Sequence, residues 1–252
     1  YAVESAYNDS AFVNGEVSFD LTDCFGFLNL YNGPTFAFKD MALQILPYLL
    51  SIAKKKNDIK EHTVILTATS GDTGSGTIFF TGCNLKCIFC QNHEISTTLI
   101  GKEVTTEEFA NICLNLQKQG ANNINLVTPT HFVPLIIEGI KLAKEKGLTL
   151  PIVYNTSSYE NVETIKMLDG IVDIYLPDLK YAENDVAKEY SKIDNYFETA
   201  ISAIKEMQKQ VGNPIFNEEG IIQKGVIIRH LILPHHLLNT KNILKYVKEN
   251  FD

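Results

Sequence analysis

Short apolar runs alternate with longer amphipathic segments from residue 77 to the end of the chain. The runs have the length of strands, whereas the segments between them repeat apolar positions at helical spacing. The predicted strands cover residues 77–81, 123–128, 152–155, 172–176 and 226–233. The predicted helices begin near residues 105, 132, 159, 195 and 239. This order is typical of repeated βα units and predicts a parallel sheet.

The first of these helices has recognisable ends. Thr105 precedes its first turn and Glu108 stands three residues later, which is the spacing of a capping box. Gly120 follows the last apolar position, where glycine commonly ends a helix. Cys113 falls on the apolar side of this helix, so we interpret it as a small buried thiol rather than a ligand.

The number of βα units limits the architecture. About five such units are too few for a closed eight-stranded barrel. We therefore predict the α/β class and, within it, a truncated partial (β/α) barrel whose last unit is absent, because the sequence stops at Asp252. The outer edge of the fifth strand is then expected to be exposed.

Residues 1–76 follow a different plan, with a polar helix at the start. A strand is predicted near 27–31, a long helix over 40–56 and a second strand over 63–69. A loop of small polar residues, Ser70–Gly76, follows this strand. Such a loop either cradles an anion on its backbone N–H groups or is a simple connection, and its spacing leaves both interpretations open.

Composition and charge limit the kinds of partner that the protein can bind. The 252 residues are 45% hydrophobic and 21% charged, as in proteins that bury a core. A formal net charge of -8 argues against nucleic acid, because its binding relies on Lys and Arg. The apolar stretch Met41–Ile52 is too short to span a bilayer, so no membrane partner is expected. The chain opens on Tyr1 without a signal peptide, which indicates a processed product or, as we favour, a fragment.

Three of the five cysteines lie close together, in the run Cys83-x-x-x-Cys87-x-x-Cys90. An odd number of clustered cysteines favours reduced thiolates in the cytoplasm over a disulfide framework. Such spacing lets one loop place several sulfurs around an iron–sulfur cluster, and three ligands leave one iron open. The alternatives are a zinc site with His93 as fourth ligand and a redox Cys-x-x-Cys pair. The loop follows the first predicted strand, where ligand sites gather in α/β sheets.

The segments around this loop resemble those of radical S-adenosylmethionine (SAM) proteins related to pyruvate formate-lyase activating enzyme. The resemblance extends from about residue 75 to residue 252. It rests on the runs Ser75–Phe80 with Gly82–Asn92, Asn123–His131, Val153–Ser157, Asp173–Tyr181 and Arg229–Pro234.

The resemblance implies a radical SAM partial barrel with a [4Fe-4S] cluster on Cys83, Cys87 and Cys90, whose open iron chelates SAM. Reductive cleavage of SAM would give methionine and a 5′-deoxyadenosyl radical that abstracts hydrogen from a substrate. The implied substrate is a glycyl-radical enzyme or a small molecule, and the implied electron donor is a flavodoxin or a ferredoxin. The implied location is the cytoplasm.

Further positions that the resemblance places near SAM lie mostly at strand ends. Phe89 is expected to pack on the adenine. Many radical SAM enzymes have a Gly-Gly-Glu-Pro stretch where this chain has Thr128–Thr130, so the glutamate that meets the ammonium group is missing here. For each polar position the alternative is a solvated side chain at a loop mouth. The expected contacts are Thr128, Pro129 and Thr130 to the amino group, Asn155 and Ser157 to ribose and carboxylate, and Lys180 to the carboxylate.

Two neighbouring residues on the last predicted strand compete for the inner face of the barrel. Arg229 and His230 alternate along the strand, so at most one of them points inward. We expect His230 to be the inward residue and to contact SAM. His235 and His236 follow a proline and are expected at the surface.

The first 74 residues resemble another family, the threonine synthases, which use pyridoxal phosphate (PLP). The resemblance rests on Ala6–Ser10, Leu30–Asp40 and Val64–Gly74. It implies that Lys39 forms the Schiff base with PLP. Without the resemblance, Lys39 is one lysine before a helix, a position that more often holds a solvated charge than a catalyst.

The two resemblances meet at Ser70–Thr77. We expect residues 1–74 to be a threonine synthase-like fragment of the PLP-enzyme α/β fold, and residues 75–252 to form the radical SAM partial barrel. The first part lacks the later glycine-rich phosphate loop of that fold, so PLP is possible only on a remnant. The expected function is that of a radical SAM enzyme. The alternatives are a PLP-dependent threonine synthase (lyase) fragment and an inactive chimera.

Overall fold

The computed structural model describes residues 18–21, 26–29, 75–98 and 101–251. The chain divides into two units, Tyr1–Leu66 and Thr67–Asp252, each of which is described by itself. In the first unit, β1 (Ser18–Leu21) pairs antiparallel with β2 (Gly26–Asn29).

Several predictions for the N-terminal part concern residues that the structure does not describe. Strand β2 overlaps the strand predicted near 27–31. The helix predicted over 40–56, the strand predicted over 63–69 and Lys39 lie outside the described residues. The boundary between residues 74 and 75 stays a prediction.

The second unit is built on a mixed sheet with the strand order β3-β4-β5-β6-β8-β7. The first five strands in this order run parallel, and β7 adds to the edge in the antiparallel direction. The α/β class and the parallel sheet predicted from the sequence are confirmed. The strands are β3 (Ser75–Phe79), β4 (Asn123–Val127), β5 (Ile152–Thr156), β6 (Ile174–Pro177), β7 (Ile215–Phe216) and β8 (Ile222–Val226).

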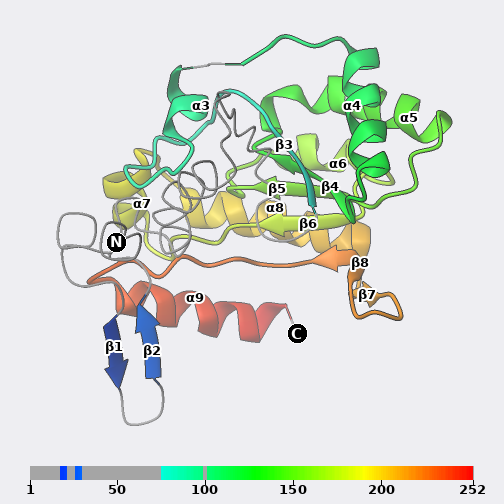
Figure 1. Ribbon diagram of the computed structural model, residues 1–252. Coiled ribbons are helices and arrows are strands. Elements are labelled where there is room, and N and C mark those ends of the chain that lie inside the picture. The colour runs from blue at the N-terminus through cyan, green and yellow to red at the C-terminus, as the bar shows by residue number, and fades with distance from the viewer. Residues whose placement is uncertain (1–17, 22–25, 30–74, 99–100, 252) are drawn as a thin grey trace, which may run out of the picture. The chain divides into compact units, whose positions relative to one another are not determined.

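Helices alternate with the strands along the chain, and α4, α5, α6 and α8 lie along one face of the sheet (Figure 1). Helices α4 and α8 contact the strands directly, α5 packs on α4, and α6 and α7 pack on α8. Among the described residues, no helix is long and apolar enough to cross a membrane. The helices are α3 (His93–Thr98), α4 (Thr106–Lys118), η1 (Thr130–Phe132), α5 (Val133–Glu145), α6 (Val162–Lys166), α7 (Asn184–Ser191), α8 (Tyr196–Val211) and α9 (Leu237–Asn250).

Helix α4 has the ends that its sequence predicts. The Thr105 hydroxyl accepts a hydrogen bond from the Glu108 N–H (3.2 Å), and the Glu108 carboxylate accepts one from the Thr105 N–H (2.8 Å). That backbone N–H also lowers the pKa of the Glu108 carboxyl. Gly120 follows the helix with a φ of +86°, a conformation that costs glycine little. Cys113 is fully buried on the inner face of α4, as expected.

The core between the sheet and its helices contains four completely buried tyrosines, Tyr154, Tyr175, Tyr181 and Tyr196. Tyr154 and Tyr175 meet edge to face with ring centroids 5.9 Å apart, and Tyr181 and Tyr196 do so at 5.1 Å. Each hydroxyl finds a hydrogen-bonding partner, as buried polar groups require. These tyrosines therefore tie the helices to the loops at the strand ends.

The last part of the sheet differs from its prediction. Strand β8 ends at Val226, where the predicted strand begins. Beyond it the chain stays bonded to its neighbour, from the Ile227 N–H to the Tyr175 carbonyl and from the Arg229 N–H to the Pro177 carbonyl, both 2.9 Å. The Leu179 N–H in turn donates to the Arg229 carbonyl (2.7 Å), which makes an isolated parallel bridge between Asp178 and Arg229. Strand β7 covers the outer edge of β8 through the pairs Ile215 with Lys224 and Phe216 with Ile222, upstream of the predicted start. Gly225 follows with a φ of +137°, and a Cβ at this position would come within 2.9 Å of Pro214.

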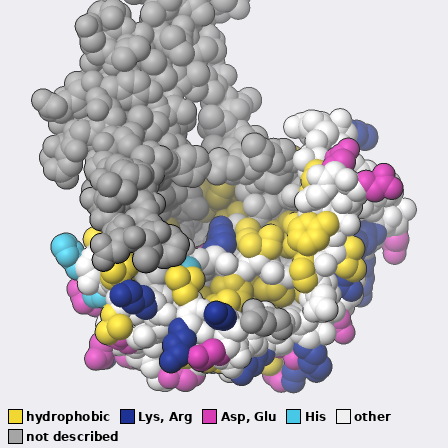
Figure 2. Space-filling view, turned by 90° about the horizontal axis from the view of Figure 1, so that it is seen from below, with side chains coloured by type: hydrophobic (Ala, Val, Ile, Leu, Met, Phe, Trp, Pro, Cys, Tyr) yellow, Lys and Arg dark blue, Asp and Glu magenta, His cyan; other side chains and the backbone are white. Residues whose placement is uncertain are grey.

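The exposed outer edge predicted for the fifth strand is wrong for β8, because β7 pairs with it. The segment that follows β8 carries exposed apolar side chains. Ile227, Leu231 and Ile232 are 41%, 45% and 54% exposed. Figure 2 shows one face of the molecule, where apolar side chains gather into a band with Lys or Arg side chains beside it. Acidic side chains on this face lie mainly toward its rim.

Candidate functional site

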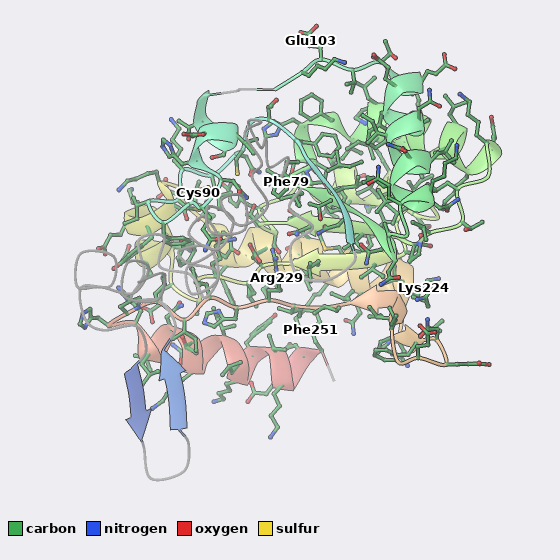
Figure 3. All side chains as sticks on the ribbon, viewed as in Figure 1. Phe79, Cys90, Glu103, Lys224, Arg229 and Phe251 are labelled. Atoms are coloured by element: carbon green, nitrogen blue, oxygen red, sulfur yellow. The ribbon has the colours of Figure 1, made fainter. Side chains whose placement is uncertain are left out.

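The loops that follow the parallel strands carry the candidate residues. In a parallel sheet the carboxyl ends of all strands meet at one edge, where ligands bind. The cysteine loop follows β3, and the other predicted positions follow β4, β5, β6 and β8. Figure 3 locates Cys90 in the loop after β3 and Arg229 on the segment after β8.

The cysteine loop is attached to the end of helix α7. The Lys86 N–H donates to the Ser191 carbonyl (3.1 Å), and the Ile88 N–H donates to the Tyr190 carbonyl (2.9 Å). The last carbonyl groups of a helix lack partners within the helix, so α7 offers acceptors that the loop uses. This attachment fixes the backbone on both sides of Cys87.

Each of the three clustered cysteines has a hydrogen-bonding group near its sulfur. The Leu85 N–H lies 3.4 Å from the sulfur of Cys83. The Ser191 hydroxyl lies 2.9 Å from the sulfur of Cys87, and the Ser96 hydroxyl lies 3.5 Å from that of Cys90. Donors of this kind stabilise thiolates, which are the form that binds iron or zinc.

Burial raises the pKa of two of these thiols, and nearby hydrogen-bonding groups and one cation oppose the rise. Burial raises the pKa of Cys83, and the Leu85 N–H opposes this rise. Burial also raises the pKa of Cys87, and the Ser191 hydroxyl opposes it. The positive charge of Lys180 favours the thiolate at both positions. Lys180 therefore links the loop after β6 electrostatically to the cysteine loop.

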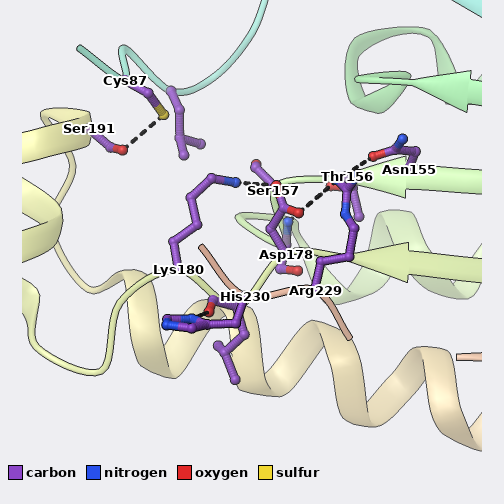
Figure 4. A network of polar contacts seen from close by, with 12 residues as sticks. Cys87, Asn155, Thr156, Ser157, Asp178, Lys180, Ser191, Arg229 and His230 are labelled. Carbon is purple, nitrogen blue, oxygen red and sulfur yellow. Dashed lines mark hydrogen bonds and ion pairs between the residues drawn. The ribbon is translucent and has the colours of Figure 1, made fainter. Parts of the chain in front are cut away.

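Two cations share one carboxylate at the ends of β5, β6 and β8 (Figure 4). Lys180 forms an ion pair with one oxygen of Asp178, and its side chain is only 11% exposed. Arg229 lies 2.7 Å from the other oxygen of Asp178 and donates a second hydrogen bond, also of 2.7 Å, to the side-chain oxygen of Asn155. Two positive charges and one negative charge leave this group of residues with one net positive charge. It is therefore suited to an anionic ligand group.

The loop after β4 begins with an unusual backbone conformation. Thr128 has a φ of +56°, which is rare for a β-branched residue, and its N–H donates to the Asn155 carbonyl (3.0 Å). Pro129 and Thr130 follow and lead into η1. Unfavourable conformations of this kind are concentrated at functional sites, where the surrounding structure maintains them.

A buried carboxylate joins this loop to the loop after β5. Glu160 is 2% exposed, and one of its oxygens accepts hydrogen bonds from the hydroxyl groups of Thr130 (2.7 Å), Thr156 (2.5 Å) and Tyr154 (3.3 Å). Burial raises the pKa of the Glu160 carboxyl, and these hydroxyl groups oppose the rise. Glu160 thus holds Thr130 against β5.

Phe89 and Ser157 are two other predicted contacts, and they lie outside the network of Asn155, Asp178, Lys180 and Arg229. The centroid of the Phe89 ring lies 6.4 Å from that of Tyr190, and the two rings are tilted, so Phe89 lies near the end of α7. The backbone carbonyl of Ser157 accepts a hydrogen bond from Tyr196 (2.9 Å), whose hydroxyl also lies 2.9 Å from the Asp178 carbonyl. The loops that carry Ser157 and Lys180 are therefore tied together by one buried tyrosine.

Arg229 and His230 face opposite ways, as their alternation predicts. His230 contacts the Leu179 carbonyl (2.7 Å) through Nδ1 and the Thr240 hydroxyl of α9 (3.0 Å) through Nε2. The structure joins Arg229, rather than His230, to Asn155 and Asp178. Contact between His230 and SAM stays a prediction.

Four residues of the site are absent from the set predicted from the sequence: Asp178, Arg229, Ser191 and Glu160. Asp178 stands two residues before Lys180 just after a strand, which was an available signal. Arg229 was the alternative to His230. Ser191 lies 104 residues from Cys87, so no local pattern indicates it. Glu160 lies 30 residues from Thr130 but only four from Thr156, so its position shortly after the strand was an available signal.

The arrangement of the three thiols bears on which metal group they could hold. Within the described part of the chain, no group of three His, Cys, Asp or Glu residues is arranged around a single metal ion. Three thiols on one loop, each with a hydrogen-bonding group near its sulfur, fit the ligands of a larger iron–sulfur cluster, which spreads its ligands over several irons.

Comparison with known proteins places most of the second unit in one family. Residues 77–231 match the family model described as Radical SAM superfamily. An uncharacterised protein of Methanocaldococcus jannaschii is 34% identical over 188 residues, 71% of this chain and 50% of that protein. The chain thus spans about half the length of this relative. A pyruvate formate-lyase-activating enzyme of Clostridium pasteurianum is 27% identical over 195 residues, 69% of this chain and 79% of that enzyme.

A second kind of similarity covers a short stretch. A threonine synthase of Schizosaccharomyces pombe is 47% identical over 58 residues, which are 21% of this chain and 11% of that enzyme.

Proposed function

This chain belongs to the Radical SAM superfamily, and we propose that it is an enzyme related to pyruvate formate-lyase activating enzyme. In this proposal Cys83, Cys87 and Cys90 hold a [4Fe-4S] cluster. When bound, the cluster supplies one electron that cleaves SAM into methionine and a 5′-deoxyadenosyl radical. The observation that carries the proposal is the loop with three thiols, each beside a hydrogen-bonding group, next to a positively charged network.

The network after β6 is assigned to the carboxylate of SAM. Lys180 and Arg229 share Asp178 and retain one net positive charge, which attracts a carboxylate. Asn155 is oriented by Arg229 through its side-chain oxygen, which leaves its N–H₂ group to donate to ribose or carboxylate oxygens. The Lys180 side chain is less exposed than those of Asp178 and Arg229. Its charge lowers the pKa of both Cys83 and Cys87.

The remaining contacts to SAM are assigned from their places beside the network. Thr128, Pro129 and Thr130 would meet the amino group, and Glu160 holds Thr130 in place. Phe89 would offer an apolar face to the adenine, since its ring borders Tyr190 at the edge of the loop. Ser157 would contact ribose.

The radical formed from SAM needs a hydrogen donor and the cluster needs an electron donor. The similarity to an activating enzyme supports a glycyl-radical enzyme as the hydrogen donor, with a small molecule as the alternative. A flavodoxin or a ferredoxin would supply the electron, and the cytoplasm would be the compartment, because open clusters and free thiols need reducing conditions.

For the N-terminal part we retain the interpretation of a threonine synthase-like segment over residues 1–74, followed by the radical SAM part over 75–252. The identity of 47% to a threonine synthase over 58 residues supports it. Lys39, the proposed PLP lysine, lies outside the described residues.

Anaerobic reconstitution with iron and sulfide tests the proposal. The wild-type chain is expected to take up iron and inorganic sulfide in equal amounts and to develop a broad visible absorbance, and Cys87→Ala should lose most of both. Cys113→Ala is the matched control, because Cys113 is fully buried in α4 away from the loop, and this variant should load like the wild type. A wild-type chain that stays colourless and binds stoichiometric zinc would refute the proposal.

A further inference from the structure

The last residue of helix α7 makes a side-chain contact with one of the clustered cysteines. The Ser191 hydroxyl lies 2.9 Å from the sulfur of Cys87 and 2.6 Å from the hydroxyl of Tyr181 (Figure 4 shows the first contact). Ser191 and Tyr181 are both completely buried. Three side chains therefore form a continuous line of hydrogen bonds that ends at the sulfur.

The chemistry of a thiolate decides which group donates and which accepts in each of these hydrogen bonds. A cysteine that ligates a metal has no S–H proton, so its sulfur only accepts. Ser191 must then donate to Cys87, and the Ser191 oxygen is left to accept from Tyr181. Tyr181 suits this role because burial raises its pKa, which keeps the phenol protonated. The ring of Tyr181 is held edge to face against Tyr196 at 5.1 Å.

The contact at Cys87 differs from those of the other two cysteines. The Leu85 N–H at Cys83 and the Ser96 hydroxyl at Cys90 lie 3.4 and 3.5 Å from the sulfurs, against 2.9 Å for Ser191 at Cys87, and the Ser96 hydroxyl donates to the His93 carbonyl. The donor at Cys87 is therefore the closest of the three, and a second hydroxyl orients it. Chains of hydrogen bonds polarise one another, which strengthens the final bond.

We propose that Ser191, oriented by Tyr181, is a positioning residue that donates a hydrogen bond to Cys87 and so makes the cluster easier to reduce. The inference rests on the proposed function, because it requires a cluster on Cys87. One electron enters from an external one-electron reductant, no bond is formed or broken, and no proton moves between Ser191 and Cys87. Reduction increases the negative charge on the ligand sulfurs, and a donor at the sulfur stabilises that charge.

The backbone allows this hydrogen bond to be removed selectively. The Lys86 N–H donates to the carbonyl oxygen of Ser191, not to its side chain (3.1 Å). Ser191→Ala therefore keeps the attachment of the cysteine loop to α7. Tyr181→Phe keeps the ring that packs on Tyr196 and removes only the hydroxyl.

The test is a redox titration of the reconstituted chain, with iron content measured for every variant. At equal iron content, Ser191→Ala is expected to lower the midpoint potential of the cluster. Tyr181→Phe should lower it by a smaller amount, and the double variant should match Ser191→Ala, because Tyr181 acts through Ser191. Ser202→Ala, which removes an exposed α8 hydroxyl bonded to its own helix, should leave the potential unchanged.

The titration can contradict the proposed role of Ser191 in several ways. A potential that is the same in wild type and Ser191→Ala would overturn the inference, and so would a further shift when Tyr181→Phe is added to Ser191→Ala. Where Ser191→Ala does not load a cluster, Tyr181→Phe decides alone: a lowered potential supports the inference and an unchanged one overturns it. A wild-type chain that loads no cluster refutes the proposed function itself.

Discussion

Glu160 is a buried acid whose environment favours the protonated form. Burial raises its pKa above the ordinary 4.5, and hydrogen bonds from Thr156, Thr130 and Tyr154 limit the rise. A group with a raised folded-state pKa stabilises the fold fully below its unfolded-state pKa, and this contribution is lost as the pH rises through the folded-state pKa. The ionisation of Glu160 therefore makes the stability of the loop that carries Thr130 depend on the pH.

Substitution of Glu160 separates its hydrogen bonds from its ionisation. Glu160→Gln keeps an acceptor oxygen and cannot ionise, so the stability of wild type relative to this variant should fall as the pH rises from about 4.5, by up to about 1.4 kcal/mol per pH unit. Glu160→Ala leaves three hydroxyl groups without their acceptor and should cost about 3 kcal/mol at acid pH. This cost should shrink with rising pH as it does for Glu160→Gln, because alanine cannot ionise either, so the difference between the two variants should not change with pH. Urea unfolding across the acid to neutral range measures both effects. A wild type that gains stability over Glu160→Gln with rising pH would contradict this account.

At the residue scale, the sequence predicts best what is encoded locally. The three cysteines share one loop, so their spacing alone indicates a common site. Lys180 and Asn155 are indicated by their places after strands, and the structure links them through Asp178 and Arg229. No pattern along the chain could indicate that Ser191 reaches the site, because its contact with Cys87 exists only once α7 has packed on the cysteine loop. Glu160, by contrast, contacts Thr156 only four residues earlier.

At the scale of elements, α4 and α5 pack closely through a glycine. Gly139 is buried in α5, and a Cβ at this position would overlap the ring of Phe109 on α4. Glycine in the middle of a helix is unfavourable by itself, so the close approach of the two helices explains its presence.

Gly139→Ala should therefore destabilise the protein despite the better helix propensity of alanine. Alanine gains about 1 kcal/mol of propensity, but overpacking against Phe109 costs about 1–3 kcal/mol, and we expect a net loss of about 1 kcal/mol in the free energy of unfolding. Glu138→Ala at the neighbouring exposed position should change it by less than about 0.5 kcal/mol. Phe109→Leu in the Gly139→Ala background should recover part of the loss. If urea unfolding shows Gly139→Ala to be more stable than wild type, the close packing of Gly139 against Phe109 is contradicted.

Strongly periodic elements are the ones that the sequence predicts well. Strands β3 to β6 begin within two residues of their predicted starts, and α4 shows its predicted cap. Helix α7, which is eight residues long and has three buried residues, is not among the predicted helices. Strand β8 is displaced because its position depends on pairing with β7 and on the conformation of Gly225.

At the scale of the whole molecule, net charge and local charge point in different directions. The chain carries a formal charge of -8, yet Lys180 and Arg229 outnumber the one carboxylate between them at the carboxyl edge of the sheet. The parallel sheet makes this possible, because it brings loops from five strands to one edge. An acidic protein thereby presents a locally positive site to an anionic group.

The central claim is that the cysteine loop supports reductive cleavage of SAM, and the product 5′-deoxyadenosine tests it most directly. The anaerobically reconstituted chain is incubated with SAM and dithionite, and the products are separated by chromatography. The account predicts 5′-deoxyadenosine and methionine in equal amounts, formed only with reductant and absent in Cys87→Ala. A wild-type chain with a full cluster that forms no 5′-deoxyadenosine would contradict it.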